Sequence, residues 1–142
     1  FEGYCLLTSS FFSAYMTNTE HRLLQAERDK TEDNTIILHD FFYKNYDLKI
    51  KYDPSDPLKP FVEFDDQIIG STAEAFGTIY GNGKLMCTQP VAYDSYYNVC
   101  QKFVFLYSTI YVVGKGTVGT YVNILEWISD EEAEQYKKEE GL

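Results

Sequence analysis

The pattern of hydrophobic and polar positions predicts short β-strands along most of the chain. Residues 35–43 form a β-branched and aromatic run of strand length. Residues 61–69 alternate between apolar and polar side chains in their first half. Residues 99–113 form the longest β-like run, which we expect to break near Ser108, and residues 120–128 supply a last strand. This pattern predicts an all-β domain with mainly antiparallel pairing.

Proline and glycine residues mark the connections between these strands. Residues 52–60 contain three prolines, each of which removes a backbone donor, so a loop is expected there. The Gly-Asn-Gly turn at residues 81–83 predicts a hairpin that joins residues 71–80 to residues 84–92. Three glycines within residues 114–119 predict a tight bend before the last strand. Together these features predict a small antiparallel barrel, complete or incomplete.

The two ends of the chain depart from this pattern. Residues 1–33 begin with clustered apolar side chains and continue into a charged stretch, so we expect an irregular N-terminal arm outside the barrel core. Deleting residues 1–16 is then expected to leave a folded domain. Ser129 and Glu132 form a capping box and predict a short C-terminal helix. The predicted organisation is an arm over residues 1–33, a barrel-like domain over residues 34–128 and a helix over residues 129–142.

Composition and charge narrow the range of functions. Aromatic residues make up 17% of the chain, and aromatic side chains favour strands over helices. Twelve basic and twenty-two acidic residues give a net charge of -10, which argues against nucleic acid and anionic lipid as partners. No apolar run approaches the roughly 20 residues of a membrane-spanning helix, so we do not expect an integral membrane protein. A basic face of a larger assembly is the partner that this charge favours.

The cysteines offer one candidate cross-link. Cys87 and Cys100 lie at symmetrical positions about Tyr93 and Asp94, so a hairpin centred there would place their Cα atoms within about 7 Å, close enough for a disulfide. Two buried thiols that act as small hydrophobic side chains are an equally good interpretation. Cys5 has no evident partner.

No catalytic, cofactor or metal motif is evident in the sequence. His21 and His39 have no cysteine or histidine at metal-ligand spacing, and an ordinary strand histidine is the better interpretation of His39. The glycine groups lack the lysine and helix of a phosphate loop, and the acidic pairs at 53/56 and 65/66 lack the EF-hand pattern. We therefore expect no cofactor and favour binding over catalysis.

From residue 35 to residue 122, the order of features resembles the allene oxide cyclase and dirigent group of eight-stranded antiparallel barrels. The segments that carry the resemblance are Ile36–Asp40, Phe64–Gly70, Gly77–Gly81, Cys87, Cys100–Phe105, Ile110 and Gly114. In that group, acidic and aromatic side chains inside the barrel bind an apolar ligand and guide its cyclisation or coupling. The resemblance implies a barrel that binds a small apolar molecule, but it assigns no functional residue in this chain.

Two functions are therefore expected from the sequence. The first is a non-enzymatic accessory subunit that docks onto a larger protein complex, with an algal plastid assembly such as a photosystem as the favoured setting and secretion as the alternative. The second is the dirigent-like or cyclase-like barrel with a small apolar ligand. For the first function, the expected partner contacts come from the aromatic side chains of the arm: Phe1, Tyr4, Phe11, Phe12 and Tyr15.

Overall fold

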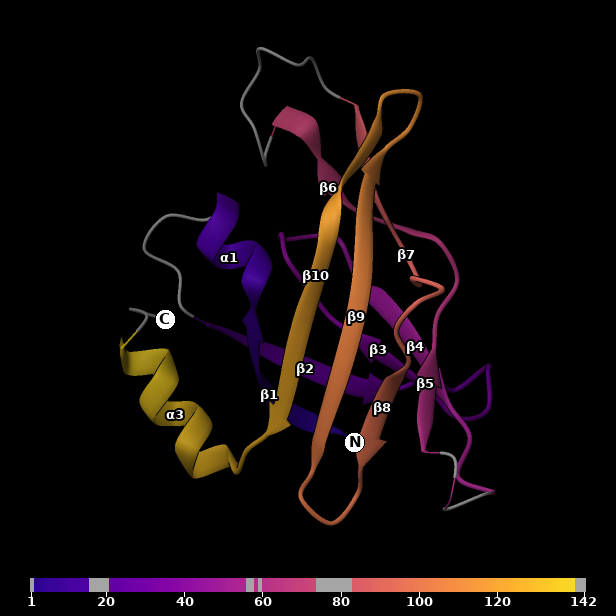
Figure 1. Cartoon of the computed structure of the whole chain (residues 1–142). Coiled ribbons are helices and arrows are strands. Elements are labelled where there is room, and N and C mark those ends of the chain that lie inside the picture. Colours follow the sequence, from indigo (N-terminus) through magenta and orange to yellow (C-terminus); the bar gives the residue numbers. More distant parts are fainter. Residues whose placement is uncertain (1, 16–20, 56–57, 59, 74–82, 140–142) are drawn as a thin grey trace.

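The computed structural model describes residues 2–15, 21–55, 58, 60–73 and 83–139. The described residues include ten strands and the helices α1 and α3 (Figure 1). In chain order they are β1 (Gly3–Ser9), α1 (Ser10–Tyr15), β2 (Arg22–Arg28), β3 (Thr35–Leu38), β4 (Leu48–Tyr52), β5 (Phe61–Glu63), β6 (Gln67–Ser71), β7 (Lys84–Thr88), β8 (Ser95–Asn98), β9 (Phe103–Val112), β10 (Gly116–Trp127) and α3 (Asp130–Glu139).

Eight of the strands close into an antiparallel barrel. Their order is β10-β1-β2-β3-β4-β5-β8-β9, and β9 pairs with β10 to complete the circle. The other two strands, β7 and β6, extend the wall from the upper half of β9, because β8 pairs only with the lower half of that strand. The prediction of a mainly antiparallel β-domain with a short C-terminal helix is confirmed, and the barrel is complete.

The prediction that residues 1–33 lie outside the barrel core is wrong. Strand β1 pairs with β10 on one side and with β2 on the other, so it closes the barrel. Its inward side chains, Cys5 and Leu7, are fully buried, and Leu24 on β2 is also in the core. The pattern was concealed because the alternate positions of β1, Tyr4 and Leu6, are apolar as well. They are half-buried on the outer side.

Aromatic side chains plug the upper end of the barrel. Phe11 and Phe12 on α1 are buried, and the ring of Phe11 stacks on that of Phe42 with centroids 4.7 Å apart. Phe42 belongs to the segment that the sequence predicted as the end of a strand over residues 35–43. That strand ends at Leu38, and the chain turns back so that these phenylalanines enter the core.

The longest hairpin is formed by β9 and β10, which stand in front in Figure 1. The predicted break near Ser108 does not occur, because the buried Ser108 hydroxyl accepts a hydrogen bond from the amide of Asn123 at 2.9 Å. The same amide bonds to the Leu106 carbonyl, and the Asn123 oxygen accepts from Ser9 at 2.6 Å. The predicted glycine bend is confirmed at the turn, where Gly114 has a φ of 77°.

The predicted strand over residues 61–69 is divided between two places in the wall. Strand β5 pairs with β4 and β8, whereas β6 pairs with β7. The hairpin predicted to join residues 71–80 to residues 84–92 is not tested, because residues 74–82 lie outside the described residues. The side chain of Gln67 joins the two parts of the wall. Its amide accepts from the Lys49 N–H at 2.8 Å and donates to the Lys49 carbonyl at 2.7 Å, as a neighbouring strand would.

Candidate functional site

An aromatic cluster covers the outer side of β8 and β9. We call this cluster, which consists of Tyr93, Tyr96, Phe103, Phe105 and Tyr107, the aromatic face. The rings of Tyr96 and Phe105 stack with centroids 5.1 Å apart, and those of Tyr93 and Tyr107 stack at 5.2 Å. Phe103 meets Phe105 edge-on at 5.6 Å. These contacts fix the ring orientations, so the face is a preformed surface.

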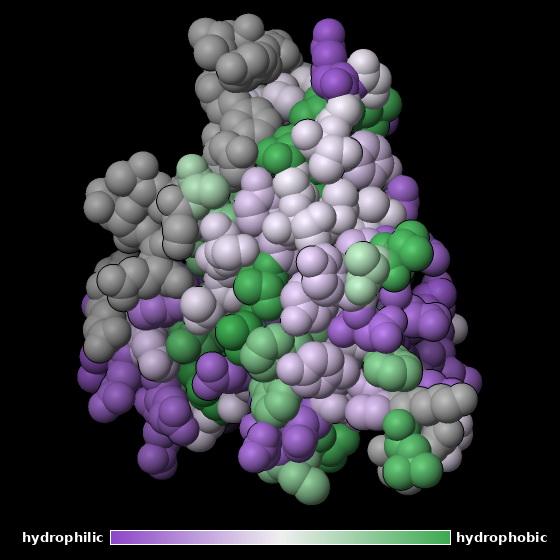
Figure 2. Space-filling view, viewed as in Figure 1, coloured by the Kyte–Doolittle hydropathy of each residue, from purple (hydrophilic) through white to green (hydrophobic). Residues whose placement is uncertain are grey.

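Strand alternation places these rings outside. Val104, Leu106 and Ile110 on β9 point into the core and are at most 1% exposed, whereas the alternate residues are half-buried. The outer row continues across neighbouring strands, because Phe105 lies opposite Tyr96 on β8 and opposite Ile124 on β10. In Figure 2 the area over β9 and β10 is mostly pale or green, with hydrophilic residues gathered mainly along its lower and side borders.

This side of the barrel is almost free of charge. Glu126 is the one charged residue within β1, β9 and β10, although the chain carries a net charge of -10. We call these three strands the uncharged wall. At its upper border, Asp66 accepts hydrogen bonds from the hydroxyls of Tyr111 at 2.9 Å and Thr88 at 2.5 Å. The bond to Asp66, together with partial desolvation, raises the pKa of Tyr111.

The opposite wall, formed by β2, β3 and β4, is charged on its outer side. His39 lies between two carboxylates, with Nε2 2.8 Å from Glu27 and Nδ1 3.1 Å from Asp47. Desolvation lowers the pKa of His39, but the bonds to Glu27 and Asp47 outweigh it and leave that pKa raised. Lys49 approaches Asp29 to 3.0 Å. The charges on this wall therefore bind one another.

The structure separates the residues that the sequence proposed as partner contacts. Phe11 and Phe12 are buried in the upper plug, so their prediction as contacts is wrong. Tyr4 is half-buried, and its hydroxyl accepts a hydrogen bond from Lys137 of α3 at 2.7 Å, which ties the helix to β1. Phe1 and the side chain of Tyr15 lie outside the described residues. The exposed aromatic surface is instead on β8 and β9, where the sequence analysis did not place it.

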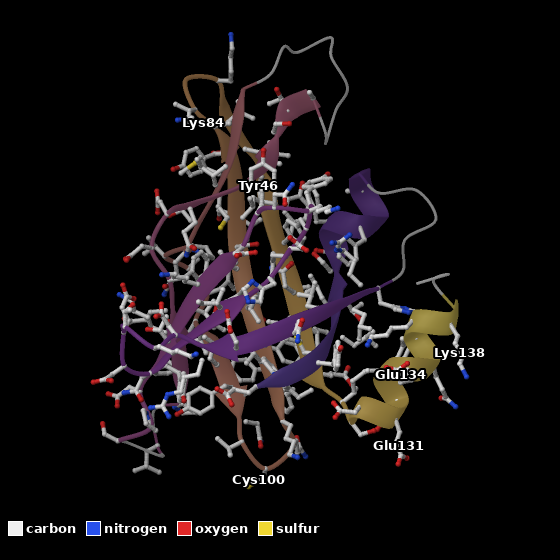
Figure 3. The ribbon with its side chains drawn as sticks, turned by 180° about the vertical axis from the view of Figure 1, so that it is seen from behind. Tyr46, Lys84, Cys100, Glu131, Glu134 and Lys138 are labelled. Atoms are coloured by element: carbon white, nitrogen blue, oxygen red, sulfur yellow. The ribbon has the colours of Figure 1, made fainter. Side chains whose placement is uncertain are left out.

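The prediction that Cys87 and Cys100 lie within about 7 Å of each other is also wrong. Both are free thiols, and of the two only Cys87 is buried. Cys87 lies on β7 opposite Ile110, whereas Cys100 lies in the turn just before Phe103, at the lower tip of the barrel (Figure 3). Ile110 and Phe103 are seven residues apart along β9, which corresponds to about 23 Å. The hairpin about Tyr93 does not form, because β8 pairs with β5 and β9. Burial raises the pKa of Cys87 to about 12.

Hollows gather at the lower end of the barrel, where β4 ends at Tyr52 and β10 ends at Trp127. Three hollows of about 540, 420 and 230 Å³ adjoin there, and Tyr52 lines all of them. Trp127 lines the largest, together with Lys102 from the turn before β9. The two ends thus differ, because phenylalanines fill the upper end and aromatic and charged side chains surround hollows at the lower end.

Among the residues that the structure describes, no helix is both long and apolar enough to cross a membrane. Among the same residues, no group of three or more His, Cys, Asp or Glu side chains is placed to hold a metal ion. The acidic pair at 65/66 borders the uncharged wall, and Asp53 accepts bonds from Ser55 in an exposed loop, while Asp56 lies outside the described residues.

Comparison with known proteins gives one match. A family model described as a domain of unknown function, DUF4984, matches residues 1–139. Searches of curated proteins and of solved structures found no match. The matched region includes every strand of the barrel and helix α3. The chain therefore belongs to the DUF4984 family.

Proposed function

We propose that this domain is a non-catalytic accessory subunit that docks onto another protein through the aromatic face and the uncharged wall. The observation that carries this proposal is the distribution of charge. Acidic and basic side chains make up 24% of the chain, yet one wall of the barrel carries a single charge and a preformed cluster of rings. Interface cores are depleted in charge and enriched in aromatic side chains, so this wall has the composition of an interface core.

The size of the wall fits a protein partner. Four strands, β8, β9, β10 and β1, are about 19 Å wide at a spacing of about 4.8 Å, and the ten residues of β9 extend about 33 Å. The resulting area of about 600 Å² approaches the roughly 800 Å² that each partner buries in a typical stable interface. Phe61 on β5, which is 44% exposed and lies opposite Tyr96, adds to this apolar surface.

Acidic side chains at the border of the wall favour a partner with basic side chains. Glu126 and Asp66 lie at the edges, and α3 beside β1 has Asp130, Glu131 and Glu132 in its first turn. An acidic border favours a partner surface with an apolar centre and a basic rim, because complementary charges speed association and exclude wrong partners. An organellar complex such as a plastid assembly remains the setting expected from the sequence. The proposal of a docking surface does not depend on that setting.

The test uses a photoreactive side chain on the wall. Thr120 is exposed beside the aromatic face, so p-benzoylphenylalanine at this position should cross-link the partner in the source cells. The matched control carries the same group at Gln25, which is exposed on β2. The cross-linked protein is then identified and purified. We expect Thr120→Glu to weaken its binding at least about tenfold and Gln25→Glu to leave it unchanged.

Three results would overturn this proposal. They are the absence of a cross-link from Thr120, an equal yield of the same product from Gln25, and cross-linking to a second copy of this chain, which would make the wall a homodimer interface. Binding that is insensitive to salt would contradict the basic rim, because attraction between exposed charges is screened.

A second candidate function is the binding of a small apolar molecule, as the resemblance to allene oxide cyclases and dirigent proteins implies. Closure of the eight-stranded barrel supports it. Buried side chains such as Leu38, Ile50 and Leu106 lie in the barrel interior, and the hollows at the lower end offer a place where a ligand would enter. The test is titration with the neutral fluorescent probe N-phenyl-1-naphthylamine. Saturable binding at one site supports this function, and a signal that never saturates contradicts it.

A further inference from the structure

Three strands change the type of their inward side chain at the lower end of the barrel. The last inward residues of β2, β4 and β10 are Arg28, Tyr52 and Trp127, and in each strand the residue two positions earlier is a buried apolar one. The inward positions of these three strands therefore change from buried apolar side chains in the core to aromatic and basic side chains at the lower end. Tyr52 and Trp127 pack against the core with one side and line the largest hollow with the other.

The hollow has the dimensions of a small-molecule site. Its volume of about 540 Å³ lies within the range of roughly 300–1,000 Å³ that is usual for such sites. A second hollow of about 230 Å³ shares Glu2 and Tyr52 with it and reaches Arg28. Lys102 lines the larger hollow. Two cations and two large aromatic side chains thus line two hollows that share Glu2 and Tyr52.

The charged side chains that line these hollows differ in whether they have a partner. The Glu2 carboxylate accepts a hydrogen bond from the Arg28 backbone N–H at 3.3 Å, and the Glu132 carboxylate accepts one from the Ser129 hydroxyl at 3.3 Å in the capping box. Among the described residues, the side chains of Arg28 and Lys102 form no ion pair, whereas Lys49, Lys51 and Lys137 each do. In a chain with an excess of acidic residues, these two cations, one at each of two neighbouring hollows, are the groups available to an anion.

We propose that the lower end of the barrel binds a small aromatic carboxylate. Its ring lies against Tyr52 and Trp127, and its carboxylate pairs with Arg28 and Lys102. Guanidinium and ammonium groups bind carboxylates through charge-assisted hydrogen bonds, and aromatic walls bind a flat ring by stacking or edge contacts. This site is separate from the docking wall, so the inference does not rest on the docking function.

The test compares 1-naphthoate with its neutral counterpart 1-naphthamide on the full chain. Trp127 is the only tryptophan in the sequence, so its fluorescence reports the hollow directly, and calorimetry measures the affinity. For a ligand of this size we expect a dissociation constant of about 1 mM for naphthoate. Naphthamide should bind at least about fivefold more weakly, because it forms no ion pair.

Two variants locate the anion contact. Arg28→Gln and Lys102→Gln should each weaken naphthoate binding about threefold to tenfold and leave naphthamide binding unchanged. Lys115→Gln, in the turn at the opposite end of the barrel, is the matched control and should bind naphthoate like the wild type.

Each contrary result would overturn the inference. Equal binding of naphthoate and naphthamide would make the hollow a purely apolar site, in agreement with the second candidate function above. An equal loss in Lys115→Gln would indicate a general effect of net charge. Naphthoate binding without a change in Trp127 fluorescence would place the ligand elsewhere, and the absence of saturable binding up to about 10 mM would exclude the site.

Discussion

The uncharged wall and the β2–β4 wall have the same inner side and different outer sides. Leu106 and Leu125 on the first and Leu38 and Leu48 on the second are all fully buried. Outside, the β2–β4 wall carries charges that bind one another, as at His39, whereas the uncharged wall presents rings and hydroxyls. Packing of the core requires apolar side chains on the inner side of every wall. Contact with water does not require either outer side to lack charged side chains. This difference is the reason for our proposal that the uncharged wall binds a partner.

The largest expected effect is the loss of β1. Deleting residues 1–16 removes the strand between β10 and β2 and two phenylalanines of the upper plug. Burial of each such side chain contributes about 1.5–3 kcal/mol, and a domain has only about 5–15 kcal/mol of net stability. We expect the truncated chain to show no cooperative thermal transition by circular dichroism. A cooperative transition would mean that the barrel closes without β1, as the sequence analysis expected.

A matched pair of substitutions tests whether the inner sides are equivalent. Leu106→Ala on the uncharged wall and Leu48→Ala on the β2–β4 wall both remove fully buried side chains. Each should lower the free energy of unfolding in urea by about 2–5 kcal/mol, because a cavity adds to the lost transfer energy. A decrease in the free energy of unfolding of less than about 1 kcal/mol for either substitution would show that the core repacks around the cavity there. The inner sides of the two walls would then not be equivalent.

The outer side of the β2–β4 wall should make stability depend on pH. Because the folded state raises the pKa of His39, protonated His39 stabilises the fold. This contribution is fully present below the unfolded pKa of about 6.5 and is lost as the pH rises through the higher folded value. We expect His39→Gln to cost under about 1 kcal/mol at pH 5.5, because the site is partly exposed, and less at pH 9.

The control for this prediction is Glu27→Gln, which removes one of the two carboxylates that contact His39. It should reduce the difference between the two pH values. A cost of His39→Gln that is the same at pH 5.5 and pH 9 would show that the histidine acts through packing alone.

The smallest expected effect on stability comes from adding one charge to the outer side of each wall, and it compares the two outer sides directly. Thr120→Glu on the uncharged wall and Gln25→Glu on β2 each add one negative charge at an exposed outer position. Both should change the free energy of unfolding by less than about 0.5 kcal/mol in urea. Only Thr120→Glu should weaken partner binding. A large loss of stability in Thr120→Glu would mean that the uncharged wall serves folding.

The aromatic face was only partly predictable. The alternation of Phe103, Phe105 and Tyr107 with Val104 and Leu106 is visible in the sequence and supports a strand. It does not show which set points outward, because both sets are hydrophobic. The hollow at the lower end was even harder to predict from the sequence, because Arg28, Tyr52 and Trp127 come from three strands that meet only in the closed barrel.

By itself, the sequence determined the local structure of this protein. The strand-forming runs, the capping box of Ser129 and Glu132 and the bend at Gly114 each depend on residues a few positions apart, so the chain specifies them directly. The tertiary structure alone decided that β1 closes the barrel, that Cys87 and Cys100 lie apart and that one wall carries a single charged residue. Those features depend on pairings such as Ser9 with Asn123, which are 114 positions apart, and such pairings are fixed by the packing of the whole core.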